Sequence, residues 1–199
     1  MKTWLYDAAV VGFWTVFGSV WRMRAHGREN VPKTGPLIIA CNHVSNLDPP
    51  VLGTACPRRI SYMAKQELFA IPLLGPLISA VGAYPVDRQG SATAAIKRSV
   101  EVLRAGGVVG IFPEGGRNIT GENEVRGGVA LLASLGRAPV VPACIVGTGN
   151  ANRLAQFHVF FGKPLVLPRD RKASREEMAN FTAEVMQAIR SLPESIGRA

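Results

Sequence analysis

The feature that most constrains the fold is the alternation of short apolar runs with helical patterns. Three runs have the length and composition of buried strands: 37–41, 108–112 and 140–146. Segments with apolar residues at helical spacing separate them, of which 91–105 is the clearest. Strands that alternate with helices form a mostly parallel sheet. The sequence therefore predicts one α/β fold, with helices flanking a mostly parallel central sheet.

Local signals predict further elements. Ser174 and Glu177 have the spacing of a capping box, so a last helix begins there. Asp48 stands directly before Pro49, which predicts Asp48 as the N-cap of a helix over 49–55. The other expected elements are strands at 59–63, 83–86 and 158–161, short helical pieces within 65–79, and a helix over 122–135.

The N-terminal segment is apolar and rich in aromatic residues, and it carries no charge from Ala8 to Trp21. It is shorter than the roughly 20 residues of a spanning helix. Asp7 and the absence of a small-residue cleavage site argue against a signal peptide. Trp and Tyr concentrate at membrane interfaces, so we expect an amphipathic helix that lies in the membrane surface. The alternative is a helix that packs on the protein's own core.

The charge balance limits the classes of partner, and the cysteine pattern indicates the redox setting. The chain has 23 Lys and Arg against 14 Asp and Glu, a formal net charge of +9. Such a balance favours an anionic partner, which could be nucleic acid, a membrane surface or a phosphorylated substrate, although solvated basic faces are also common. Cys41, Cys56 and Cys144 form no Cys-x-x-Cys pattern, so neither a zinc site nor a disulfide framework is indicated and a reducing cytoplasmic setting fits best.

Two of the predicted strands end in residues that can carry chemistry. Asn42 and His43 follow the first strand, and Asp48 comes five positions after His43. A histidine oriented by a carboxylate is a general base. The alternative is that Asp48 only caps a helix while His43 is an ordinary hydrogen-bonded residue.

The second such segment is 112–118, Phe-Pro-Glu-Gly-Gly-Arg-Asn. Gly115 and Gly116 allow a backbone to approach a ligand closely, and Arg117 can bind a phosphate through two hydrogen bonds. Lys65 and Arg88 supply cations between the two segments, although surface charge alone also explains a single Lys or Arg.

Together these motifs resemble the glycerophospholipid acyltransferase family over roughly residues 36–148. The family's first motif, Asn-His, four residues, then Asp, is intact as Asn42-His43 through Asp48. Its second matches Lys65 and Arg88, and its fourth resembles 140–145. Its third, Phe-Pro-Glu-Gly-Thr-Arg-Ser, stands here with Gly116 for Thr and Asn118 for Ser.

The resemblance implies the reaction. A fatty acyl group passes from acyl-CoA or an acyl carrier protein thioester to the free hydroxyl of 1-acyl-sn-glycerol-3-phosphate, giving phosphatidic acid. His43 is then the base and Asp48 orients it. Arg117, Lys65 and Arg88 bind the acceptor phosphate, while Glu114, Gly115 and Gly116 shape the pocket. No cofactor beyond the thioester co-substrate and no metal is expected.

The resemblance also implies an organisation and a location. Residues 1–28 would be the membrane-docking helix and 29–199 the catalytic domain, at the cytoplasmic face of the cell membrane as a monotopic or peripheral protein. Anionic lipid is then a partner, whereas nucleic acid is not expected, because the sequence has no nucleic-acid motif with interleaved aromatic residues. Rival functions are acylation of glycerol-3-phosphate or another lysophospholipid, and a non-catalytic basic membrane-binding protein. A nucleophilic thiol at Cys41, two residues before His43, is a further alternative mechanism.

Overall fold

The computed structural model describes residues 3–72, 74–80, 82–86, 92–118, 127–168 and 173–194. It contains one seven-stranded sheet in the order β1-β7-β6-β2-β5-β3-β4, in which β6 and β7 are antiparallel and every other neighbouring pair is parallel. The strands are β1 (Arg24–His26), β2 (Leu37–Cys41), β3 (Ile60–Lys65), β4 (Ala83–Val86), β5 (Val108–Ile111), β6 (Val140–Val146) and β7 (His158–Phe161). The predicted α/β architecture is confirmed.

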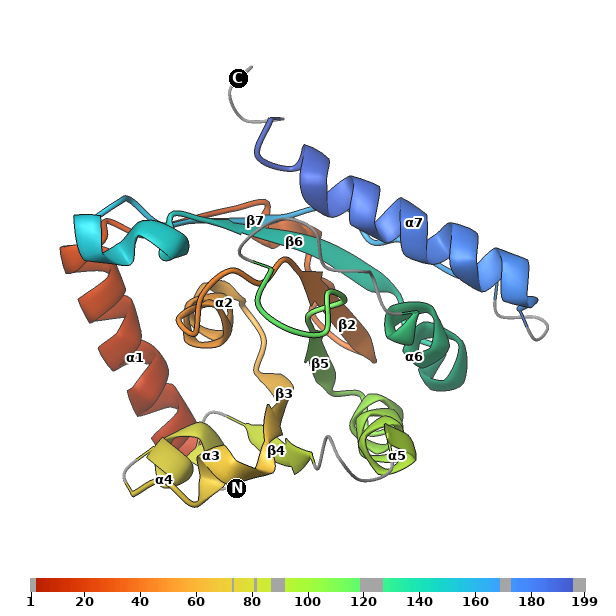
Figure 1. Cartoon of the computed structure of the whole chain (residues 1–199), viewed down its shortest axis with the longest axis horizontal. Coiled ribbons are helices and arrows are strands. Elements are labelled where there is room, and N and C mark those ends of the chain that lie inside the picture. Colours follow the sequence, from red (N-terminus) through yellow and green to blue (C-terminus); the bar gives the residue numbers. More distant parts are fainter. Residues whose placement is uncertain are drawn as a thin grey trace.

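Helices cover both faces of this sheet (Figure 1). They are α1 (Thr3–Val20), α2 (Asp48–Ala55), α3 (Gln66–Phe69), α4 (Leu74–Ala80), α5 (Ala92–Arg104), α6 (Gly128–Gly136) and α7 (Arg175–Ser191), with short 3-10 turns η1 (Arg28–Asn30) and η2 (Thr148–Arg153). Helices α1 and α2 lie on one face, and α5, α6 and α7 lie on the other.

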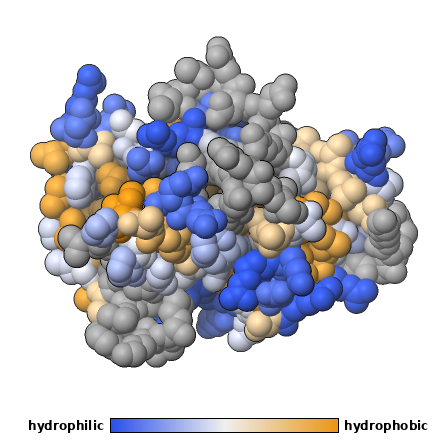
Figure 2. Space-filling model, turned by 60° about the horizontal axis from the view of Figure 1, so that its bottom comes forward, coloured by the Kyte–Doolittle hydropathy of each residue, from blue (hydrophilic) through white to orange (hydrophobic). Residues whose placement is uncertain are grey.

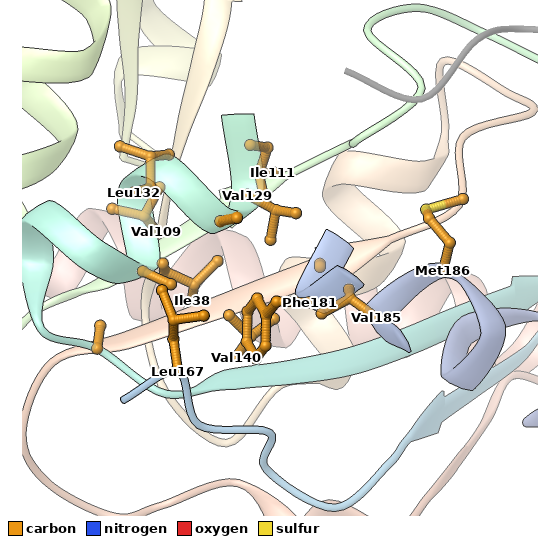
Figure 3. Packing of buried hydrophobic residues seen from close by; sticks show 14 of the residues in the cluster. Ile38, Val109, Ile111, Val129, Leu132, Val140, Leu167, Phe181, Val185 and Met186 are labelled. Carbon is orange, nitrogen blue, oxygen red and sulfur yellow. The ribbon is translucent and has the colours of Figure 1, made fainter. Parts of the chain in front are cut away.

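The central strand β2 supplies side chains to both layers of core. Its five residues are wholly buried. Ile38 and Ala40 pack toward α6 and α7, where Figure 3 shows Ile38 among the side chains of that cluster, while Leu37, Ile39 and Cys41 pack toward α1 and α2. Successive side chains of a strand point to opposite faces, so a fully apolar run is what a strand covered on both faces requires.

The N-terminal helix uses one side to pack on the protein. Phe17 is buried, and its ring lies 6.1 Å from that of Phe157. Phe13 and Trp21 continue this contact one turn on either side. The alternative that α1 packs on the core is thus confirmed for this stripe. A second apolar set remains exposed on the helix, namely Val11, Trp14, Val16 and Val20. Within the described residues, no helix combines the length and the apolar character that crossing a bilayer requires.

One strand was not predicted, one expected helix lies partly outside the described residues, and one expected cap is wrong. The sequence did not predict β1, whose three residues pair in parallel with β7 and form one edge of the sheet. Helix α6 begins only at Gly128, with Gly127 as its N-cap, while 119–126 lie outside the described residues. Asp48 is not an N-cap, because it is the first residue of α2 and Leu47 holds the cap position without a side-chain hydrogen bond. The capping box of Ser174 and Glu177 is present as predicted.

Candidate active site

Asn42 ties the end of β2 to the end of β6. Its side-chain Oδ1 accepts a hydrogen bond from the Ile145 N–H at 2.7 Å, and its Nδ2 donates to the Ile145 carbonyl at 2.9 Å. An amide side chain has the donor and the acceptor that this two-way contact needs. The bond fixes where the chain leaves β2, and therefore where the next residue, His43, begins.

Asp48 lies wholly buried under the loop that carries His43. Its Oδ2 accepts from His43 Nδ1 at 2.9 Å and from the Val44 and Ser45 N–H groups at 2.7 Å each. Its Oδ1 accepts from the hydroxyl of Thr148 at 2.6 Å. A buried carboxylate needs such donors to replace water. Asp48 turns back toward its own loop to make these bonds, which is why it does not cap α2.

The contact with Asp48 also fixes the state of the imidazole. A carboxylate accepts only, so His43 Nδ1 carries the proton in this bond and Nε2 is the basic nitrogen. The His43 side chain is 16% exposed, and its ring stacks on Phe112 with centroids 4.3 Å apart. The residue is therefore held from two sides, and its basic nitrogen is the part that can act on a bound molecule.

The turn after β5 is hydrogen-bonded to the loop that carries His43. Glu114 Oε2 accepts from the His43 backbone N–H at 2.9 Å, and Glu114 Oε1 accepts from Asn118 Nδ2 at 3.1 Å. The Asn118 N–H donates to the His43 carbonyl at 2.7 Å. Strands β2 and β5 are parallel neighbours, so their carboxyl ends meet at one edge of the sheet, where α/β proteins place their sites. His43 and the 112–118 turn, the two segments that follow predicted strands, therefore lie together at this edge.

Comparison with known proteins identifies this arrangement. A family model described as Acyltransferase matches residues 22–146, the part of the chain that carries both loops. The chain belongs to the acyltransferase family. A relative named 1-acyl-sn-glycerol-3-phosphate acyltransferase from Bacillus subtilis (strain 168) is 32% identical over 180 residues, which cover 87% of this chain and 89% of that protein.

Two further proteins are similar to this chain over most of its length, the second of them in fold. A 1-acyl-sn-glycerol-3-phosphate acyltransferase from Streptococcus pneumoniae is 26% identical, with 96% of this chain and 73% of that protein covered. The crystal structure of the 1-acyl-sn-glycerophosphate (LPA) acyltransferase PlsC from Thermotoga maritima superposes with a TM-score of 0.77 at 24% identity, covering 98% of this chain and 80% of that one. The predicted family and the enzyme class, acyltransferase, are confirmed.

The glycines of this acyltransferase turn differ in what they do. Gly115 has a φ of +67°, a conformation that L side chains rarely adopt, and its N–H donates to the Phe112 carbonyl at 3.0 Å. That N–H closes the turn and is already engaged. Among the described residues, a Cβ added at Gly116 would meet no atom within 4 Å, so they leave room there for a larger side chain.

The predicted cations fall partly outside the described structure. Arg117 is exposed on the turn, directly before Asn118. Lys65 is the last residue of β3, which pairs with β5, so its backbone lies at the same edge of the sheet, but its side chain lies outside what the structure describes. Arg88 lies outside the described residues altogether. The described residues contain no group of three or more His, Cys, Asp or Glu placed to bind a metal ion.

Cys41 is not arranged as a nucleophile. Its side chain is wholly buried, and this burial raises the pKa of the thiol well above its usual value. The reactive form of cysteine is the thiolate, which burial disfavours. The thiol alternative is therefore not supported by the position of Cys41.

Sequence reasoning missed Thr148. It lies one hundred residues from Asp48 in the chain and is nearly fully buried. Thr148 follows the end of β6, the other parallel neighbour of β2. A polar residue just past a buried strand was the available signal, because that strand ends at the same edge of the sheet as His43.

Proposed function

We propose that this acyltransferase moves a fatty acyl group from an acyl thioester, carried by coenzyme A or acyl carrier protein, to the free hydroxyl of 1-acyl-sn-glycerol-3-phosphate, which gives phosphatidic acid. The observation that carries the proposal is the contact of His43 Nδ1 with the buried carboxylate of Asp48. The names of the relatives from B. subtilis and S. pneumoniae support the choice of acceptor.

The proposed reaction starts with proton removal by His43 Nε2 as the acceptor oxygen attacks the thioester carbonyl carbon. A carbon–oxygen bond forms, the intermediate collapses, and the carbon–sulfur bond breaks. The proton on His43 then passes to the leaving sulfur, which yields the free thiol. Asp48 stabilises the transient imidazolium, as carboxylates do in related acid–base pairs. The chemistry needs no covalent enzyme intermediate.

The proposed substrate contacts come from the turn after β5 and from two cations outside it, Lys65 and Arg88. Arg117, with Lys65 and Arg88, is proposed to bind the acceptor phosphate, because guanidinium and ammonium groups bind phosphate strongly. Glu114, Gly115 and Gly116 shape the pocket, with Glu114 acting through its bond to the His43 backbone. Since the Gly115 N–H is engaged in the turn, the Gly116 N–H is the better candidate donor to the oxyanion.

The last part of the proposal is that the protein acts at a membrane surface, on which α1 docks. The exposed set on α1 is apolar, and the guanidinium of Arg28 lies 5.9 Å from the centre of the Trp14 ring. Apolar side chains gather on the left of Figure 2, the side on which α1 lies in Figure 1. An apolar helix with flanking cations suits the headgroup region of an anionic bilayer. The chain is therefore proposed to act as a peripheral or monotopic protein of the cytoplasmic face, with residues 1–28 docking and 29–199 catalytic.

An acyl transfer assay with radiolabelled donors tests the function. It compares lysophosphatidate, glycerol-3-phosphate and other lysophospholipids as acceptors, and coenzyme A and carrier-protein thioesters as donors. The expected result is phosphatidic acid as the main product, lost in His43→Ala. A preference for glycerol-3-phosphate or another lysolipid would replace the acceptor. Transfer to no acceptor, with intact vesicle binding, would favour the non-catalytic membrane-binding protein.

A further inference from the structure

The turn η2 ends in an exposed leucine in an unfavourable backbone conformation. Leu154 has a φ of 53° and a ψ of 32°, in the left-handed region, and its residue surface is 64% exposed. Glycine and asparagine enter this region more easily than a residue with a large side chain. Leucine at this position is neither favoured by the backbone conformation nor buried in the core. Residues held in such strained conformations cluster at functional positions.

Leu154 lies beside the carboxyl-terminal end of α1. The Ala151 carbonyl accepts hydrogen bonds from both the Leu154 N–H at 3.1 Å and Trp21 Nε1 at 2.9 Å. Gln156 Nε2 donates to the Arg22 carbonyl at 3.0 Å. In Figure 1 η2 is the cyan coil next to the upper end of the red helix α1. Leu154 thus adds to the exposed apolar set of α1. Val20, the last residue of α1, is the member of that set at this end of the helix.

The segments at this corner carry net positive charge, with Glu29 as an exposed acidic residue among them. Four arginines with exposed side chains come from its segments: Arg22, Arg24, Arg28 and Arg153. Arginine beside exposed apolar side chains complements an anionic lipid surface, where the headgroups bind the cations and the acyl layer receives the apolar tips. This charge pattern favours lipid over an apolar protein partner.

The same turn leads to the active site. Its first residue, Thr148, donates to Asp48, so the two ends of η2 touch the catalytic loop and the exposed corner. We propose that Leu154, flanked by Arg153 and Arg22, is a second membrane contact that inserts into anionic lipid beside α1 and holds the His43 edge against the bilayer. The inference rests on the proposed work at a membrane, but it concerns η2 and not α1.

The test is partition of the intact protein onto vesicles of phosphatidylcholine and phosphatidylglycerol, measured by sedimentation. Leu154→Asn introduces a residue that adopts the left-handed backbone more easily than leucine does, so the melting temperature should not fall. Loss of one inserted leucine should weaken partition by about tenfold. The matched control is Leu135→Gln, which removes a leucine 47% exposed on α6, on the other face of the sheet; its partition should equal that of the unchanged protein.

Activity separates this contact from the chemistry. With acceptor presented in vesicles, acyl transfer by Leu154→Asn should fall along with partition, whereas with a short-chain acceptor dissolved as monomers it should match the unchanged protein. Unchanged partition of Leu154→Asn, equal losses in both leucine variants, or no vesicle binding by the unchanged protein would each overturn the proposal. Because partition needs no turnover, failure of the proposed acyl transfer would leave this measurement intact.

Discussion

The three histidines of this chain occupy two environments that differ in their partners. His43 donates through Nδ1 to the buried carboxylate of Asp48, which also accepts from two backbone N–H groups and a threonine hydroxyl. His26 and His158 instead face each other at the edge of the sheet, with His26 Nε2 3.2 Å from His158 Nδ1 and their rings stacked with each other and on Phe160.

The difference between these environments is electrostatic. A carboxylate beside His43 favours the imidazolium that proton transfer creates. At the sheet edge, the neighbour of each histidine is another imidazole, and burial, His26 and Arg24 lower the pKa of His158. The fixed negative partner of His43 therefore marks the histidine that can act as a base, whereas the surroundings of His158 oppose its protonation.

The largest expected effect is loss of the base. His43→Ala should reduce kcat by about 10³-fold or more, because general base catalysis contributes 10²–10⁴-fold in enzymes. Asp48→Asn should reduce it nearly as much, since an amide no longer stabilises the imidazolium. The measurement is kcat with lysophosphatidate and acyl-CoA.

His26→Gln supplies the control for this comparison. It alters the other histidine environment and should leave kcat unchanged. Asp48→Asn is also expected to lower the melting temperature, because its buried donors lose acceptor oxygens, whereas His43→Ala should not. An active His43→Ala enzyme would remove His43 from the chemistry and erase the distinction between the two environments.

A smaller effect is expected from Thr148, which acts through Asp48. Thr148→Val keeps the shape of the side chain and removes the hydroxyl that donates to Asp48 Oδ1 at 2.6 Å. A lost hydrogen bond to a charged group is worth about 1.5–3 kcal/mol, so kcat should fall by about ten- to a hundredfold while the KM for both substrates stays unchanged. Steady-state kinetics measure both constants.

Thr148→Ser separates positioning from packing. Serine retains the hydroxyl and should restore most of kcat, although it leaves a methyl-sized gap. If serine and valine variants lose equal activity, Thr148 serves packing alone, and the orientation of Asp48 depends on the loop donors from Val44 and Ser45.

The sequence could predict the elements that burial dictates. Strands β2, β5 and β6 are apolar throughout because both faces of the sheet are covered, and such runs are visible without a structure. The predicted contact of His43 with Asp48 is confirmed, and the parallel neighbour β5 brings its turn to the same edge of the sheet. The family and the enzyme class followed from the resemblance carried by four motifs in the sequence.

Other features depend on contacts that local patterns do not encode. β1 is three residues long and begins with an arginine, so it has no apolar run, and only its pairing with β7 makes it a strand. Asp48 before Pro49 matched a capping pattern. In the structure, however, its carboxylate accepts hydrogen bonds from the Thr148 hydroxyl and from the loop N–H groups instead of capping α2. Partners so far apart in the chain become visible only when the sheet is assembled.

The smallest expected effect concerns acid stability at the sheet edge. The pKa of His158 is lowered in the folded protein, so the unfolded chain binds a proton first as the pH falls. The stabilising contribution is present above the usual histidine pKa of about 6.5 and is lost as the pH falls through the lower folded value.

His158→Asn keeps a polar group near Nδ1 but does not titrate. Urea unfolding at pH 7.5 and pH 5.5 should therefore show a smaller drop in stability for His158→Asn than for the unchanged protein, with activity at pH 7.5 unaltered. Equal drops would mean that the surroundings of His158 do not oppose its protonation, and the contrast with His43 would then rest on Asp48 alone.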